Sequence, residues 1–226
     1  MIGIIPAAGH ATRLHGLPKF LLPIPGGYLL ERLADRIGVP CFIGASHHTY
    51  PFVDAYKRAE DIAYLVDSAS MPQTILGARR YAGHQHVLTG MPDTYWDDEQ
   101  VFPNLARSLD GGAMAAAAVF AVGPEQARGL GMCELREDDD DGLIIARIDD
   151  KPARTSLRYA WGALAWTLDF WDFIHEDDAH MGVALQRAIR AGVHVAAYPA
   201  AGAYYDCGTP QDYWRCIREL TEREIA

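Results

Sequence analysis

Two cations close to the N-terminus have the chemistry for binding phosphate. Arg13 ends a loop of small residues, Pro6-Ala7-Ala8-Gly9-His10-Ala11-Thr12, and Lys19 follows soon after Pro18. Small residues let backbone N–H groups approach a ligand closely, and such turns cradle phosphate oxygens. The Arg13 guanidinium offers a planar fork of donors, whereas the Lys19 ammonium is a mobile point charge. The loop therefore predicts a triphosphate site, the plain alternative being an ordinary strand-to-helix connection.

Two better-known phosphate-binding loops do not fit this sequence. The G-x-x-x-x-G-K-[ST] pattern of a P-loop is absent from the chain. The G-x-G-x-x-G pattern of dinucleotide-binding folds is also absent from the N-terminal loop, because Gly9 is followed by Ala11 and Leu14. The triphosphate prediction thus depends on the two cations and the small residues between them.

The apolar pattern predicts the elements that position this loop. Strands are expected over residues 2–6, 39–44, 62–66, 86–89, 113–122, 132–136, 143–148, 159–167 and 193–198. Helices are expected over residues 28–37, 52–58, 72–81, 101–109 and 180–191, with a last one starting at Thr209-Pro210. This order indicates an α/β protein with a Rossmann-like, mainly parallel mixed sheet and helices on both faces. Ligands of such sheets bind at the carboxyl ends of the strands, where the N-terminal loop lies.

Composition limits the other functions of the chain. The 226 residues suffice for one domain, which we expect to span residues 1–226, and the formal net charge of −10 argues against a nucleic-acid partner. The four cysteines have no metal-ligand spacing, so they predict reduced thiols. No stretch resembles a signal peptide or a membrane span, so we expect a cytoplasmic protein. The acidic run in residues 137–142 is expected to be a solvated hairpin turn rather than a metal site.

The N-terminal loop resembles a known family. Its residues are similar to the A-A-G-x-G-T-R…P-K signature of the sugar-phosphate nucleotidyltransferases, which include glucose-1-phosphate thymidylyltransferases, and the matching positions are Ala7, Ala8, Gly9, Thr12, Arg13, Pro18 and Lys19. Ala11 replaces the second glycine of that signature. The resemblance implies that the loop holds an NTP, that Arg13 stabilises the triphosphate and that Lys19 reaches the reacting phosphates.

Further resemblances follow in the same order along the chain. The segment from Pro72 to Ala78 resembles the one that helps to recognise the base, which implies that Gln73 is a nucleotide contact, although an exposed residue in a first helical turn is nearly as good an explanation. Asp93, in Thr89-Gly90-Met91-Pro92-Asp93-Thr94, resembles the first metal-binding acid. The inserted Met91 and Pro92 leave Asp97 and Asp98 as alternative ligands.

The second half of the chain carries the remaining motifs. Asp150-Lys151-Pro152 resembles E-K-P, which implies that Lys151 holds the acceptor phosphate and that Asp150 contacts the acceptor. Gly131 and Gly162 fall where the family places glycines that line the acceptor site, their plain alternative being a turn or a tight strand contact. Asp206, in Tyr205-Asp206-Cys207-Gly208-Thr209-Pro210, resembles the second metal ligand of W-x-D-x-G-T-P.

Together these motifs imply a fold, a cofactor and a reaction. The fold implied is the GT-A-like fold of nucleotide-diphospho-sugar transferases. The reaction is Mg²⁺-dependent transfer of a nucleoside monophosphate from an NTP to a sugar 1-phosphate. Asp93 and Asp206 each follow a predicted strand, so both side chains are expected at the same edge of the sheet, as a pair of Mg²⁺ ligands.

Two other functions stay open at this point, namely transfer to a non-sugar acceptor such as phosphocholine, and a catalytically silent sensor of nucleotides or sugar phosphates. The partners expected are the NTP and a phosphorylated small molecule, with homo-oligomerisation left open. The sequence does not identify the base or the acceptor.

Overall fold

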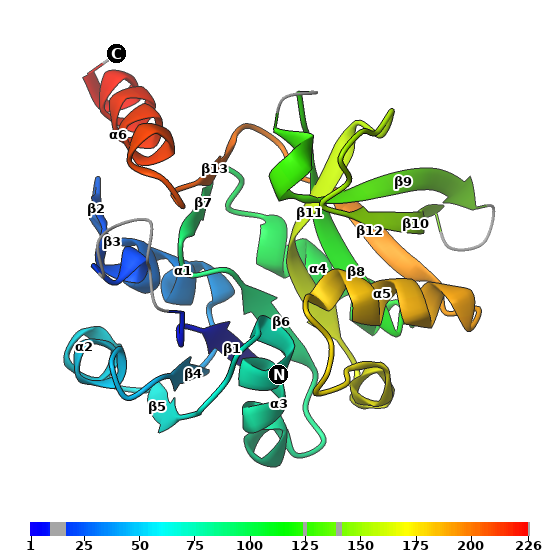
Figure 1. Cartoon of the computed structure of the whole chain (residues 1–226), viewed down its shortest axis with the longest axis horizontal. Coiled ribbons are helices and arrows are strands. Elements are labelled where there is room, and N and C mark those ends of the chain that lie inside the picture. Colours follow the sequence, from blue (N-terminus) through cyan, green and yellow to red (C-terminus); the bar gives the residue numbers. More distant parts are fainter. Residues whose placement is uncertain (10–16, 124–125, 139–141, 226) are drawn as a thin grey trace.

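The chain adopts an α/β fold, described here from a computed structural model (Figure 1). The structure describes residues 1–9, 17–123, 126–138 and 142–225. The helices are α1 (Leu29–Ile37), α2 (Tyr50–Tyr56), α3 (Met71–Ala82), α4 (Val101–Asp110), α5 (Met181–Arg190) and α6 (Pro210–Ile225), with short 3₁₀ helices η2 (Lys19–Leu21), η3 (Ala127–Gly129) and η4 (Leu168–Phe173). Among the described residues, no helix is both long and apolar enough to cross a membrane.

The described strands form one large sheet and two small ones. The strands are β1 (Ile2–Pro6), β2 (Pro23–Ile24), β3 (Gly27–Tyr28), β4 (Cys41–Ala45), β5 (Ile62–Leu65), β6 (Val87–Gly90), β7 (Thr94–Trp96), β8 (Ala115–Ala121), β9 (Gly131–Asp138), β10 (Gly142–Asp150), β11 (Tyr159–Trp166), β12 (Val195–Pro199) and β13 (Tyr204–Asp206). The large sheet has the order β5-β4-β1-β6-β11-β8-β12-β10-β9.

The large sheet is mixed, as the sequence predicted. The run β5-β4-β1-β6 is parallel, and β12 is parallel to β8, whereas β11, β10 and β9 pair with their neighbours in antiparallel fashion. Strand β9 also pairs with β11, with Cys133 opposite Tyr159. The strands β11, β8, β12, β10 and β9 therefore curl into a ring, on the right of Figure 1.

Helices cover both faces of the sheet, again as predicted. On one face, Ile4 of β1 packs in a buried cluster with Ile75 of α3. On the other, the neighbouring Ile5 packs with Leu33 of α1 and Leu105 of α4. Because successive side chains of a strand point to opposite faces, the apolar run of β1 supplies both cores.

A two-stranded sheet made of β7 and β13 lies outside the large one. In this antiparallel pair, Tyr205 is opposite Tyr95 and Asp206 is opposite Thr94. Tyr205 packs in a third buried cluster with Leu22, Cys216 of α6 and other apolar side chains. The small sheet therefore joins the middle of the chain to its C-terminal helix (Figure 1).

The elements expected from the apolar pattern are all present, with ends that differ by no more than two residues. The acidic run closes the β9–β10 hairpin, because Asp138 pairs with Gly142, and residues 139–141 lie outside the described part of the chain. The sequence did not predict β2, β3, β7 or β13. These strands have only two or three residues each, too few for a readable alternation, and β7 and β13 form through pairing with each other over a long sequence separation.

Gly162 of β11 occupies a position where a larger residue does not fit. A Cβ there would lie 2.6 Å from Cζ2 of Trp96 and 2.9 Å from Cε2 of Tyr204. We expect Gly162→Ala to lower the free energy of unfolding by about 1–3 kcal/mol, the usual cost of overpacking. The melting temperature should fall by roughly 2–4 °C for each kcal/mol in a chain of this size. Thermal unfolding followed by circular dichroism measures this change. Gly129→Ala is the matched control, because a Cβ at Gly129 meets no atom within 4 Å. Equal melting of Gly162→Ala and the wild type would contradict the packing described for β11.

Candidate active site

The structure brings Asp93 and Asp206 side by side through backbone pairing. Asp206 is the last residue of β13 and lies opposite Thr94, which directly follows Asp93. The amide of Cys207 donates to the Asp93 carbonyl oxygen at 2.8 Å. The amide of Gly208 donates to Oδ1 of Asp206, also at 2.8 Å, and so fixes this carboxylate. The two acids thus meet at the end of the small sheet rather than at adjacent strands of the large one.

Lys19 lies beside both acids. Its Nζ is 2.9 Å from Oδ2 of Asp93, with the two side chains 18% and 26% exposed. A Cβ at Gly208 would lie 2.8 Å from Oδ1 of Asp206 and 3.5 Å from the Lys19 ammonium. Lys19 follows Pro18 and opens η2, which places this cation of the N-terminal loop against acids from two other parts of the chain.

The electrostatic balance at the acid pair is negative. Burial raises the pKa of the Asp206 carboxyl, and the nearby Asp93 carboxylate raises it further, while the Gly208 amide and Lys19 act in the opposite direction. Two carboxylates share one ammonium, so their local sum is one negative charge. A divalent cation would relieve this repulsion, and carboxylate oxygens are ligands that Mg²⁺ prefers. The donor set at Asp93 and Asp206 therefore fits Mg²⁺.

The two alternative acids considered in the sequence have other partners. Oδ2 of Asp97 accepts the Ala203 amide at 2.8 Å and pairs with Arg223. Oδ2 of Asp98 accepts the hydroxyl of Tyr198 at 2.8 Å and the Ala201 amide at 2.9 Å. Both acids fasten the segment that leads into β13, so the geometry favours Asp93 over them as the partner of Asp206.

The N-terminal loop borders a cavity of about 340 Å³. Its lining comes from the carboxyl end of β1 and from the start of α3, and comprises Pro6, Ala8, Gly9, Ser68, Ala69, Ser70, Met71 and Thr74. Ala7 is buried in the core instead, and its amide donates to Gly44 at 2.7 Å. Thr12 and Arg13 lie outside the described residues. The cavity lies where the sequence predicted a nucleotide, at a strand's carboxyl end.

Gln73 does not line this cavity. Its Oε1 accepts the Ala69 amide at 2.7 Å, and its Nε2 donates to the Glu176 carbonyl oxygen at 2.9 Å. One end of the side chain therefore binds the segment just before α3, and the other end binds the loop before α5. The role of Gln73 in base recognition stays a prediction, which these contacts do not favour.

Gly131, Asp150 and Lys151 lie together at the ends of β9 and β10. Asp150 is opposite Gly131 in the hairpin, and the Lys151 amide donates to Leu130 at 2.9 Å. A Cβ at Gly131 would collide with the indole Nε1 of Trp161. Gly162 is separate from this group, because its contacts are Trp96 of β7 and Tyr204 of β13. The tight contact considered for both glycines is therefore present.

His180 joins this group, although the sequence singled it out only as a helix start. The Lys151 Nζ lies 3.3 Å from each ring nitrogen of His180. The His180 Nε2 lies 3.6 Å from Oδ2 of Asp150. No sequence pattern signals this contact, since His180 is one of nine histidines and comes well after Lys151.

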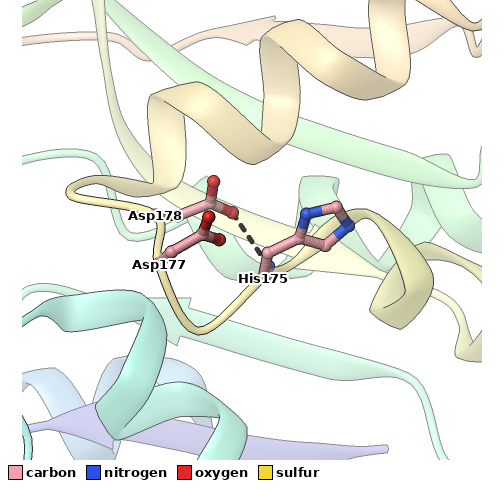
Figure 2. A group of neighbouring side chains, drawn as sticks. All are labelled: His175, Asp177 and Asp178. Carbon is pink, nitrogen blue, oxygen red and sulfur yellow. Dashed lines mark hydrogen bonds between the residues drawn. The ribbon is translucent and has the colours of Figure 1, made fainter.

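His175, Asp177 and Asp178 form another cluster of potential metal ligands, between η4 and α5 (Figure 2). Oδ2 of Asp178 accepts the His175 amide at 2.8 Å and Nη1 of Arg187 at 2.9 Å, while its Oδ1 accepts Nη2 of the same guanidinium. These bonds to Arg187 lower the pKa of the Asp178 carboxyl. Both Asp178 oxygens thus hold the loop to α5, and the cluster has a structural explanation.

Solved structures share this fold over nearly the whole chain. A UDP-glucose pyrophosphorylase complexed with UDP-glucose aligns with a TM-score of 0.83 and 17% identity, covering 98% of both chains. A protein described as a glucose-1-phosphate thymidylyltransferase from Bacillus anthracis aligns with a TM-score of 0.84 and 16% identity over 97% of this chain and 95% of that one.

A UTP-bound UGPase from Acinetobacter baumannii aligns with a TM-score of 0.78 and 16% identity over 96% of this chain and 92% of that one. No family model and no curated protein sequence matches the chain. The chain therefore has the GT-A-like fold that the sequence predicted.

Repulsion between the Asp93 and Asp206 carboxylates lowers the stability of the metal-free protein. Asp206→Asn removes a charge that repels Asp93 and keeps an oxygen for the Gly208 amide. In EDTA at pH 7 we expect this variant to melt at or above the wild-type temperature. Lys19→Met removes the shared cation and should lower the melting temperature. Thermal unfolding of the three proteins in EDTA measures both effects. If Asp206→Asn melted well below the wild type while Lys19→Met was unchanged, this electrostatic description would be wrong.

Proposed function

We propose that the protein is a nucleotidyltransferase that joins the nucleoside monophosphate of an NTP to a sugar 1-phosphate and releases pyrophosphate. The observation that carries this proposal is the meeting of Asp93, Asp206 and Lys19, on a fold shared with UDP-glucose pyrophosphorylases. Residues from three distant parts of the chain converge there with the charges that such a reaction needs. The motifs of the sequence supply the same residues independently.

The reaction requires no protein nucleophile. An oxygen of the acceptor phosphate forms a bond to the α-phosphorus of the NTP, and the bond from this phosphorus to the β-bridging oxygen breaks. The protein's task is to hold two anions that repel each other and to neutralise the charge that develops. Lys19 would neutralise the α-phosphate beside the acids. Lys151 would hold the acceptor phosphate, and Arg13 of the N-terminal loop would hold the triphosphate.

Asp93 and Asp206 would hold Mg²⁺, which supplies further positive charge next to the phosphates when it is bound. The Asp93 side chain is 26% exposed, and Asp206 lines a cavity. Phosphate oxygens and water can therefore complete the coordination. The raised pKa of the Asp206 carboxyl has the sign expected for an acid that lacks its counter-cation.

The space for the acceptor is a cavity of about 600 Å³ next to Asp206. Gly129 and Leu130 line it from one side, and Tyr204 and Tyr205 line it from another. Leu130 accepts the Lys151 amide, so the backbone of Lys151 is bonded to one wall of this cavity. This arrangement supports Lys151 as the acceptor contact and Asp206 as the metal contact of one site.

Pyrophosphate release tests the proposal. The purified protein is supplied with Mg²⁺, each common NTP in turn, and a panel of sugar 1-phosphates together with phosphocholine. We expect release that requires both an NTP and one sugar 1-phosphate, and that excess EDTA abolishes. Release only with phosphocholine would move the acceptor to the non-sugar class. No release with any pair would contradict the proposed function.

The acid pair predicts a non-additive mutant cycle. Asp93→Asn and Asp206→Asn keep the side-chain shape and remove the charge, so each variant should fold and lose most of its turnover. The double variant should be little slower than the slower single one, because both acids serve one ion. Steady-state pyrophosphate release measures the turnover of the four proteins. Fully multiplicative losses would show that the acids act separately, and wild-type turnover of Asp206→Asn would exclude it as a ligand.

A further inference from the structure

Two of the four cysteines contact each other beside the candidate metal-binding acids. Cys207 follows Asp206 directly, and Cys216 lies in α6. Both side chains are buried in the apolar cluster that joins the small sheet to α6. The Cys207 thiol donates a hydrogen bond to Sγ of Cys216. The proposed reaction uses neither sulfur, so this thiol pair is a reactive group without an assigned role.

The other two cysteines have different surroundings. Cys41 packs in the buried cluster on one face of the large sheet, and Cys133 packs in the cluster on the other. Their thiols donate to backbone carbonyl oxygens, at 3.4 Å for Cys41 and 3.8 Å for Cys133. Burial raises the pKa of both thiols to about 12, which keeps them protonated and unreactive. The pKa of Cys216 is lowered instead, because the Cys207 thiol stabilises its thiolate.

The backbone links the thiol pair to the acid pair. The Cys207 amide donates to the Asp93 carbonyl oxygen at 2.8 Å, and this bond helps to hold Asp206 beside Asp93. The S–S bond of a disulfide is about 2.05 Å long, which is shorter than any hydrogen bond between two thiols. Formation of a disulfide would therefore draw Cys207 toward α6 and disturb the bond from its amide to Asp93.

We propose that Cys207 and Cys216 form a peroxide-sensitive switch, in which a disulfide between them weakens the metal site of Asp93 and Asp206. The reduced pair is the resting state, and oxidation separates the two acids. Disulfides that form and break in this way are typical of redox sensing. Formation of the disulfide does not depend on the proposed function, whereas its effect on turnover rests on that function.

The oxidation is balanced with hydrogen peroxide as the oxidant. The Cys216 thiolate attacks one peroxide oxygen, the O–O bond breaks, and hydroxide leaves behind a sulfenic acid. The Cys207 sulfur then attacks the Cys216 sulfur, so that an S–S bond forms and the S–O bond breaks. The two thiol protons leave in two molecules of water. Because both sulfurs are buried, the oxidant must be small and must enter through local opening at the start of α6.

The test counts thiols in the wild-type protein after treatment with hydrogen peroxide. The treated protein is unfolded in guanidinium chloride, its free thiols are titrated, and its peptides are identified by mass spectrometry. We expect two of the four thiols to be lost, with a disulfide between Cys207 and Cys216 that dithiothreitol reverses. A disulfide that involves Cys41 or Cys133, a bond between two chains, or no reversible loss of thiols would overturn the proposal.

The second measurement follows the metal site. Mg²⁺ that binds the folded protein raises its melting temperature, and we expect the disulfide to remove most of this rise. Turnover should fall roughly tenfold, the usual effect of disturbing groups that orient metal ligands. Equal responses of the reduced and oxidised proteins to Mg²⁺ would overturn the switch. Loss of the Mg²⁺ response in a protein that releases no pyrophosphate in either state would refute the proposed function and leave the switch standing.

Two variants assign the response to the thiol pair. Cys216→Ala should keep the Mg²⁺ response of the reduced protein and lose its sensitivity to peroxide. Cys133→Ala is the matched control, because Cys133 is equally buried and this variant also removes one thiol. It should respond to peroxide as the wild type does. Persistence of the response in Cys216→Ala would contradict the proposal, and the thiol count of the wild type does not depend on either variant.

Discussion

The carboxylates of Asp93 and Asp206 repel each other, yet the pairing of β7 with β13 holds them side by side with Lys19 as their shared cation. Much of the surrounding structure secures this arrangement. Tyr205 and Cys216 pack α6 onto the small sheet, and Gly162 leaves room for Trp96 and Tyr204 beneath it. A site that concentrates negative charge in this way is suited to a divalent cation, and without one it repels a polyphosphate.

The two parts of the large sheet provide the two sides of the proposed site. The parallel run β5-β4-β1-β6 presents the N-terminal loop and the cavity at the start of α3. The ring of β11, β8, β12, β10 and β9 presents Asp150 at the end of β10, with Lys151 directly after it. The small sheet and α6 join these parts (Figure 1). A reaction between two phosphorylated substrates needs such a division, because each anion requires its own set of counter-charges.

The sequence predicted the large elements because their apolar patterns are long and locally readable, as in β1 and α1. It also predicted that Asp93 and Asp206 would meet, but for an incomplete reason, since the strands that join them are too short to show a pattern. The contact between His180 and Lys151 depends on how distant segments pack. Gln73 was singled out by resemblance, and one of its two side-chain hydrogen bonds goes to a loop about a hundred residues away. Local sequence patterns thus identified the candidate metal-binding and phosphate-binding side chains, and tertiary packing decided which of them share a site.

The central claim is that this acid pair supports attack on the α-phosphorus of an NTP. Its most direct test follows a radiolabel from NTP labelled at the α- or the γ-phosphate, with a sugar 1-phosphate and Mg²⁺. The account predicts that the α label appears in the sugar product and the γ label in pyrophosphate. Transfer of the γ label to the sugar, or its release as inorganic phosphate by the protein alone, would contradict it.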